Sequence, residues 1–340
     1  MSPLIWARDL TKRYRIPSAR PGFRGAVRQL FAPRYEEKIA VRDLNLTIEA
    51  GESVACLGPN GAGKSTTIKM LTGLLVPSGG ELLVRGVVPH EHRQRNAQNV
   101  SVIFGQRTQL WWDLPVIDSL RLLGDIYQVP ADRFRSNLDM CVDLLEIEPL
   151  LRLPARSLSL GQRMRCDLAA AFLHEPALLF LDEPTIGLDI AVKERVRKFI
   201  RKMNKEEGVT VLLTSHDLGD IEGLCDRILI IDKGRLLFDG SPSALGARFG
   251  QERVVHLALK DSVDSVEVRC NGVLSALGAR IEQLSPREAL VFFDPARSTA
   301  AAVIGALLPL VPTEDLRVTE PSMEAVIRKI YDGDTQEPFG

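Results

Sequence analysis

A glycine-rich segment with a single lysine is the part of the sequence best suited to chemistry. It reads Gly58-Pro-Asn-Gly-Ala-Gly-Lys-Ser-Thr66, which matches the pattern G-x-x-x-x-G-K-[ST] at every position. Glycines let backbone N–H groups turn inward and approach several negative charges closely, and a helix that follows adds its positive N-terminal end. We therefore expect this segment, the phosphate loop, to hold the phosphates of a nucleoside triphosphate.

Each residue of the phosphate loop has an expected role. Lys64 would neutralise the β- and γ-phosphates, and the hydroxyl of Ser65 would bind Mg²⁺. The expected nucleotide contacts are Gly58, Pro59, Asn60, Gly61, Ala62, Gly63, Lys64, Ser65 and Thr66. A strand-length apolar run precedes the loop at Ser53–Leu57, and a helical pattern begins at about Lys64. This context argues against the alternative, which is a glycine-rich turn without function.

Two carboxylates form an acidic pair, Asp182 and Glu183, at the end of the apolar run Leu178-Leu-Phe-Leu. Ligands of open α/β sheets bind at the C-terminal ends of the strands, so this pair is expected beside the phosphate loop. Asp182 would hold Mg²⁺ through water, and Glu183 would orient and deprotonate an attacking water. Solvated acids at a strand end are the alternative, against which the intact phosphate loop argues.

The elements that must position these residues can be traced in the hydrophobic pattern. Strand-length apolar runs alternate with helical patterns as far as about residue 245, which predicts an α/β fold with a mostly parallel sheet. The further strands expected are Val100–Phe104, Leu178–Leu181, Val209–Thr214 and Arg227–Ile231. A helical insert is predicted between Pro115 and Pro154. The region 246–340 is predicted to be a small α+β domain, with strands at Val254–Leu259 and Ala289–Phe293 and helices at Ser298–Leu308 and Ser322–Tyr331.

Composition and charge narrow the class of function. The chain has 340 residues and a net charge of -1, so no overall basic field indicates nucleic acid. Its 5 cysteines show no paired spacing, as expected of reduced cytosolic thiols. The N-terminus lacks the apolar run of a signal peptide, and the least polar stretch, near 300–311, is shorter than the roughly 20 residues that span a bilayer. We therefore expect any work at a membrane to be done from its cytoplasmic face.

Further segments give the chain a resemblance to the ABC-family ATPases. Leu158-Ser-Leu-Gly-Gln162 is similar to the family signature L-S-G-G-Q, with Leu160 in place of the first glycine. Gln106 matches the family's Q-loop, Gly187-Leu-Asp189 its D-loop, and His216 its switch histidine. Tyr14 matches the aromatic residue that stacks on adenine. These motifs follow the family's order and cover residues 1 to about 245.

The resemblance implies a P-loop NTPase with a RecA-like core in residues 1–245 and a helical signature subdomain at about 107–165. It implies ATP and Mg²⁺ as ligands, with Lys64, Gln106, Glu183 and His216 in catalysis and Gln106 also at the metal. It further implies that two chains pair head-to-tail as a homodimer or pseudo-dimer, each closing its signature over the other's nucleotide. The contacts implied there are Ser159, Gly161, Gln162 and Asp189. Independently, Ser159 precedes a helical pattern and is a natural N-cap.

An arginine-rich insertion, residues 15–38, follows Tyr14. Within it Phe23, Val27, Leu30 and Phe31 recur at helical spacing. A basic amphipathic helix at 20–34 would suit a lipid surface or a partner protein, and certain exporters of polysaccharides and drugs look similar here. A solvated surface loop is an equal alternative. Trp111 and Trp112 follow the Q-loop. Two adjacent tryptophans cannot both point inward from a regular element, so one is expected at the surface, and contact with a partner is favoured over core packing.

The favoured function is that of an ABC transporter motor that works with an integral membrane permease subunit. The motifs resemble those of the daunorubicin/viologen-type drug exporters, which favours export. The alternative is a soluble ABC ATPase that remodels ribosomes or DNA, but such chains usually carry tandem ATPase units or a long coiled coil. An unrelated P-loop kinase or GTPase is disfavoured by the signature, Gln106 and His216.

Overall fold

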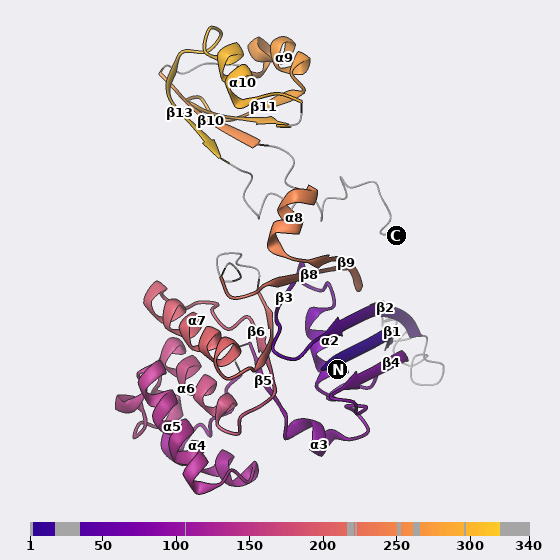
Figure 1. Cartoon of the computed structure of the whole chain (residues 1–340), viewed down its shortest axis with the longest axis vertical. Coiled ribbons are helices and arrows are strands. Elements are labelled where there is room, and N and C mark those ends of the chain that lie inside the picture. The colour runs from indigo at the N-terminus through magenta and orange to yellow at the C-terminus, as the bar shows by residue number, and fades with distance from the viewer. Residues whose placement is uncertain are drawn as a thin grey trace, which may run out of the picture. The chain divides into compact units, whose positions relative to one another are not determined.

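The computed structural model describes residues 3–17, 35–105, 107–215, 221, 223–249, 253–260, 266–295 and 297–319 (Figure 1). The chain divides into two compact units, Met1–Gly240 and Ser241–Gly340. The sequence placed this boundary slightly later, after residue 245. Helix α8 (Pro242–Phe249) therefore belongs to the second unit.

A central sheet of six strands forms the core of the first unit, in the order β5-β6-β7-β3-β8-β9. The parallel strands are β3 (Ser53–Leu57), β5 (Val100–Phe104), β6 (Leu178–Asp182), β7 (Thr210–Thr214) and β8 (Arg227–Asp232). β9 (Arg235–Gly240) pairs antiparallel with β8. The five parallel strands confirm the predicted apolar runs to within one residue at each end, whereas β9 was not predicted. β3 and β7 are buried along their whole length, as expected where helices cover both faces of a parallel sheet.

A second, antiparallel sheet has the order β2-β1-β4 and comprises β1 (Ile5–Pro17), β2 (Tyr35–Ile48) and β4 (Gly79–Val84). Helix α2 (Lys64–Leu71) joins it to the central sheet, because Ile68 and Met70 lie in one apolar cluster with side chains of both sheets. Helix α3 (Arg93–Ala97) precedes β5.

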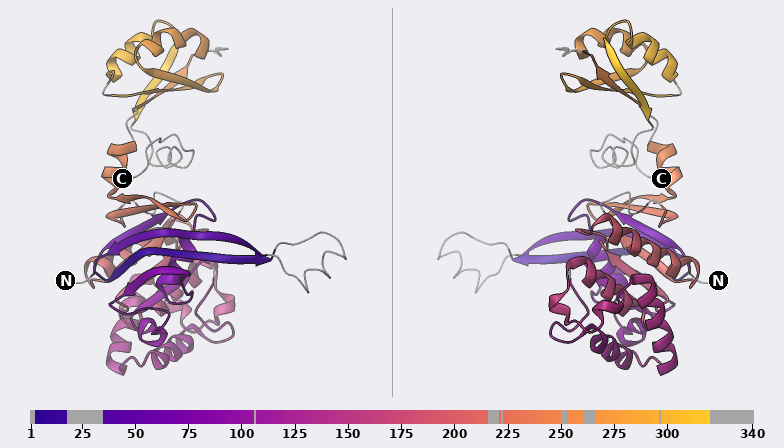
Figure 2. Two further views of the ribbon diagram at one scale, coloured as in Figure 1. Left: turned by 90° about the vertical axis from the view of Figure 1, so that its right-hand side faces the viewer. Right: turned by 90° about the vertical axis from the view of Figure 1, so that its left-hand side faces the viewer.

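The ends of the predicted insertion are strand rather than part of a separate element. β1 and β2 continue pairing from Tyr14↔Lys38 to Pro17↔Tyr35, and Figure 2 shows them extending as a two-stranded arm. The backbone ladder of the hairpin therefore runs through both ends of the predicted insertion, 15 and 38. Phe23, Val27, Leu30 and Phe31 lie outside the described residues, so the amphipathic helix at 20–34 stays a prediction.

The helical insert contains α4 (Val116–Ile126) and α5 (Ala131–Leu145), followed by short 3₁₀ turns and the signature helix α6 (Leu160–Phe172). α7 (Ile190–Lys205) follows β6 and buries an apolar face that includes Val196 and Phe199. Figure 1 shows these four helices grouped on one side of the central sheet. The helical pattern predicted between Pro115 and Pro154 is thus present.

Two titratable side chains on or just after α6 are buried, with opposite effects on their pKa. The His174 ring stacks on Tyr127 with 3.8 Å between centroids, and neither ring nitrogen has a hydrogen-bond partner within the described chain. Burial lowers the pKa of His174 to about 4. Asp167 on α6 accepts hydrogen bonds from the Thr108 hydroxyl at 2.7 Å and the Gln109 N–H at 2.9 Å. Burial outweighs these bonds and raises the pKa of Asp167 to about 6.

These shifts predict opposing pH dependences of the free energy of unfolding between about pH 4 and 6. There the unfolded state binds a proton at His174 that the folded state does not, whereas the folded state binds one at Asp167 that the unfolded state does not. Relative to wild type, His174→Phe should therefore make stability fall with rising pH, and Asp167→Asn should make it rise, by roughly 1.4 kcal/mol per pH unit each. Urea unfolding of wild type and both variants at about pH 4.5 and 6 measures these slopes. The same change of stability with pH in all three proteins would contradict the pKa shifts of His174 and Asp167.

The second unit has a β-α-β-β-α-β arrangement. Its elements are β10 (Arg253–Leu259), α9 (Val266–Ala276), β11 (Ala279–Ser285), β12 (Glu288–Phe293), α10 (Ala300–Leu307) and β13 (Thr313–Thr319). The sheet order is β11-β12-β10-β13, with antiparallel neighbours. Val255, Val291 and Phe293 form its core with Leu274 and Val303 of the helices. The predicted strands at 254–259 and 289–293 and the helix at 298–308 are present, and the helix predicted at 322–331 lies outside the described residues.

The state of the cysteines and the lengths of the apolar helices can be compared with what the sequence predicts. All five cysteines are free and buried, as predicted. In the part of the chain that the structure describes, no helix is both long and apolar enough to cross a bilayer.

Candidate active site

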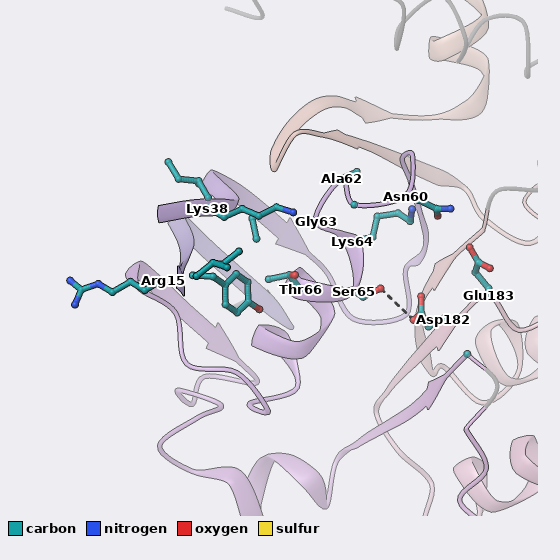
Figure 3. A pocket seen from close by; sticks show the side chains of 16 residues that line it. Arg15, Lys38, Asn60, Ala62, Gly63, Lys64, Ser65, Thr66, Asp182 and Glu183 are labelled. Carbon is teal, nitrogen blue, oxygen red and sulfur yellow. Dashed lines mark hydrogen bonds between the residues drawn. The ribbon is translucent and has the colours of Figure 1, made fainter. Parts of the chain in front are cut away.

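The phosphate loop and the acidic pair line one cleft of about 610 Å³ (Figure 3). The loop contributes residues 60–66, and β6 ends at the opposite wall with Asp182 and Glu183. Tyr14 from β1 and Lys38 from β2 border the same cleft, as does Gly105 after β5. The structure thus brings together the predicted phosphate, acidic and adenine-stacking residues from segments far apart in the sequence.

Close backbone contacts explain two glycines of the phosphate loop. Gly63 has a φ of 113° immediately before α2, and a Cβ added there would lie 2.5 Å from the carbonyl oxygen of Ala40. A Cβ at Gly58 would lie 2.3 Å from the carbonyl oxygen of Ile231. Since neither backbone oxygen can give way cheaply, only glycine fits these positions, and the loop is held against β2 and β8.

Lys64 lies inside the curve of the loop. Its side chain is largely buried, and Nζ donates hydrogen bonds to the carbonyl oxygens of Gly58 at 2.5 Å and Pro59 at 3.2 Å. Gly58 and Pro59 thus hold the lysine rather than line the cleft. A buried ammonium bonded only to neutral carbonyls lacks a full counter-charge here, which suits it to bind phosphate.

Two hydroxyl groups orient Asp182 by donating hydrogen bonds to its two carboxylate oxygens. Thr214, its neighbour in the register of β6 and β7, donates to Oδ1 at 2.6 Å, and Ser65 donates to Oδ2 at 3.4 Å. Ser65 and Asp182 therefore present two adjacent hard oxygens, the donor type that Mg²⁺ prefers, and the residues present fit that ion. Sequence reasoning missed Thr214, although it ends a predicted strand.

Glu183 occupies an unusual backbone conformation. Its φ is 53°, and its N–H donates to both the carbonyl and the hydroxyl oxygen of Thr214 at 3.1 Å. The left-handed region is costly for a residue with a Cβ, and such strain gathers at functional sites. The bend directs the chain out of β6 and leaves the Glu183 side chain on the wall of the cleft beside Asp182 (Figure 3).

The signature residues do not line this cleft. Ser159 is the N-cap of α6 in a capping box: its Oγ accepts the Gln162 N–H at 3.3 Å, and Gln162 Oε1 accepts the Ser159 N–H at 2.9 Å. The predicted N-cap is therefore confirmed. Asp189 is the N-cap of α7 and accepts the Val192 N–H at 2.9 Å. Their predicted contacts with nucleotide, like that of Gly161, stay predictions.

Leu160, the departure from the signature pattern, packs against the D-loop of its own chain. Its Cδ2 lies 3.0 Å from the position of a Cβ added to Gly187, whose φ is 72°. The side chain therefore occupies space that only a glycine at position 187 leaves open. Gln106 and His216 lie outside the described residues, so their predicted roles stay predictions. Gly105, the described neighbour of Gln106, borders the cleft, and its N–H donates to the Asp182 carbonyl at 3.1 Å.

Comparisons with known proteins agree with this geometry. Residues 41–186 match the ABC transporter family. The Nod factor export ATP-binding protein I of Burkholderia lata is 35% identical over 216 residues, which cover 62% of this chain and 69% of that protein. This chain belongs to the ABC transporter family. It is an ATP-binding protein and an ATPase of that family.

Two further relatives of this ABC ATPase extend the comparison. The linearmycin resistance ATP-binding protein LnrL of Bacillus subtilis is 28% identical over 295 residues, which cover 85% of this chain and 93% of that protein. The solved structure of cbiO1 from Clostridium perfringens, described as part of the ABC transporter complex cbiONQ, has a TM-score of 0.59. It is 26% identical, and the match covers 73% of this chain and 92% of that one. The predicted fold, a P-loop ATPase with a parallel central sheet, is confirmed.

Proposed function

We propose that this ATPase drives export by a separate membrane-spanning subunit, from the cytoplasmic face of the membrane. The observation that carries the proposal is the single cleft in which Lys64, Ser65, Asp182 and Glu183 converge. The direction of transport is supported by relatives named for linearmycin resistance and Nod factor export. ATP hydrolysis is the energy source that such a site supplies.

Each residue of the cleft has a separate role in the proposed reaction. Tyr14 stacks on adenine, and Lys64 exchanges its carbonyl partners for the β- and γ-phosphates. Ser65 and Asp182 hold Mg²⁺, which when bound neutralises phosphate charge. Glu183 accepts a proton from the water whose oxygen attacks the γ-phosphorus. The bond from that phosphorus to the β-bridging oxygen breaks, and ADP and phosphate are released.

A second copy of the chain completes the site in this proposal. Ser159 is the N-cap of α6, and Gly161 and Gln162 belong to its first turn, where the N-terminal end of the helix suits a γ-phosphate. They do not line the cleft of their own chain, so a head-to-tail partner is needed to bring them to nucleotide. Gln106 and His216 would complete the catalytic set from the cleft's own chain.

An exposed aromatic pair is the proposed contact with the membrane subunit. Trp111 and Trp112 are 40% and 51% exposed, so both, rather than one, face the surface. Their loop is fixed: the Trp111 N–H donates to Ser119 Oγ at 3.1 Å, and the Arg163 guanidinium lies 5.8 Å from the centre of the Trp112 ring. Large aromatic side chains held rigidly at a surface are typical of protein interfaces.

The proposal is tested by replacing both tryptophans with aspartate in cells that contain the native transporter. We expect the share of the chain that sediments with membranes to fall several-fold, because interface aromatics carry much of the binding energy. ATP affinity of the purified chain should be unchanged. Leu74→Asp, at a residue 62% exposed, is the matched control and should leave membrane association intact. A wild-type chain that sediments with ribosomes or DNA instead would favour the soluble remodelling ATPase.

A further inference from the structure

Lys38 is a further cation at the nucleotide cleft, besides Lys64 and Arg15. It stands on β2 directly opposite Tyr14 of β1, and opposed residues of an antiparallel pair present their side chains on the same face, with Cβ atoms about 4.5–5.5 Å apart. Both residues border the cleft. Figure 3 shows the amine of Lys38 directed toward the phosphate loop near Gly63.

The strand that carries Lys38 is fixed against the phosphate loop. Ala40 lies two residues further along β2, about 6.8 Å away, and its carbonyl oxygen is the atom that excludes a Cβ at Gly63. The Arg42 N–H donates to the Gly234 carbonyl at 2.8 Å, and the Gly234 N–H donates to the Ala62 carbonyl at 2.8 Å. The position of Lys38 relative to the loop is therefore set by backbone contacts.

Neighbouring cations of the arm have other partners. Arg15 lies 3.9 Å from Glu37, and its guanidinium points away from the cleft in Figure 3. Lys12 Nζ donates to the Val76 carbonyl at 2.7 Å. Within the described part of the chain, the side chain of Lys38 makes no ion pair and no hydrogen bond. This exposed ammonium at the edge of the cleft is therefore available to bind a phosphate group.

We propose that Lys38 binds the α-phosphate of the nucleotide, an inference that rests on the proposed use of this cleft for ATP. With adenine on Tyr14 and the β- and γ-phosphates at Lys64, the α-phosphate lies between the two, on the side where Lys38 projects. The charge of the α-phosphate is the same in ATP and ADP. Lys38 therefore binds substrate, transition state and product equally, so it sets affinity rather than the rate of the chemical step.

The test compares Lys38→Ala with Arg13→Ala in the full chain. Arg13 is an exposed cation of the same arm that does not line the cleft, so it controls for the loss of one positive charge. Calorimetric titration with ADP and with a non-hydrolysable ATP analogue should show affinities roughly three- to tenfold weaker for Lys38→Ala, by the same factor for both ligands. KM for ATP should rise by that factor at a retained kcat, and the difference from wild type should shrink as salt is added.

Three results would overturn the assignment to the α-phosphate. They are unchanged affinities in Lys38→Ala, a loss confined to the triphosphate analogue, and an equal loss in Arg13→Ala. A failure of the cleft itself is distinguishable, since wild type would then bind neither ligand. Because Lys38 is exposed, the variant should unfold at the wild-type temperature, which thermal unfolding checks.

Discussion

Glu183→Gln is expected to lower the rate of ATP hydrolysis by about two to four orders of magnitude while ATP binding is retained. Glutamine keeps the shape of the side chain, and the backbone bend at φ 53° with its two bonds to Thr214 does not depend on the carboxylate. The amide cannot accept a proton from water, so only the chemical step suffers. Single-turnover hydrolysis and nucleotide titration of the purified variant measure the two effects separately.

The control for this variant is Glu207→Gln, which removes one negative charge at an exposed position after α7 and should hydrolyse ATP at the wild-type rate. Uncleaved ATP should also hold two chains together, so Glu183→Gln should sediment as a dimer with Mg²⁺ and ATP and as a monomer with ADP. Near-normal hydrolysis by the variant would remove Glu183 from the catalytic set. Absence of the dimer alone would instead contradict the proposed pairing of Ser159 with a second nucleotide.

The central sheet could be predicted from the sequence because its strands are apolar along their whole length. β3 and β7 are buried at every residue, so burial and sequence pattern coincide. In the second unit β11 and β13 were not predicted. β13 reads Thr-Glu-Asp-Leu-Arg-Val-Thr, and its only large apolar residues, Leu316 and Val318, are half-buried and 39% exposed, respectively, at the sheet edge. Nothing in that pattern separates an edge strand from a loop.

Some residues of the candidate site could likewise be predicted from the sequence, and others could not. The phosphate loop and the acidic pair could be predicted because their chemistry is local: a few consecutive residues carry the whole signal. Thr214 and Lys38 reach the cleft only through strand register, which pairs Thr214 with Asp182 and Lys38 with Tyr14. The direction of the Leu160 side chain likewise depends on Gly187 in the following loop. Contacts across strands and between loops are fixed by tertiary structure, and no local sequence pattern encodes them.

Lys64→Ala should weaken ATP binding by about a hundredfold and abolish measurable hydrolysis. Lys64 is only 8% exposed and its ammonium lies within the curve of the loop, where its charge meets phosphate with little screening. Hydrogen bonds to charged groups contribute about 1.5–3 kcal/mol each, and the lysine would make one or two. Titration with a fluorescent ATP analogue measures the loss, which should exceed that for ADP because the γ-phosphate contact is also gone.

A matched control separates the loss of this contact from a change in net charge. Lys69→Ala alters the same helix by the same charge at an exposed position in its last turn, and it should bind ATP as the wild type does. Lys64 also donates hydrogen bonds to the carbonyls of Gly58 and Pro59, and Lys64→Ala removes both of these bonds to the loop. Lys64→Arg keeps the charge but not the shape of the ammonium, and it should also bind poorly in so confined a space. Unchanged ATP affinity in Lys64→Ala would contradict the assignment of the phosphate loop, because no other described cation lies within its curve.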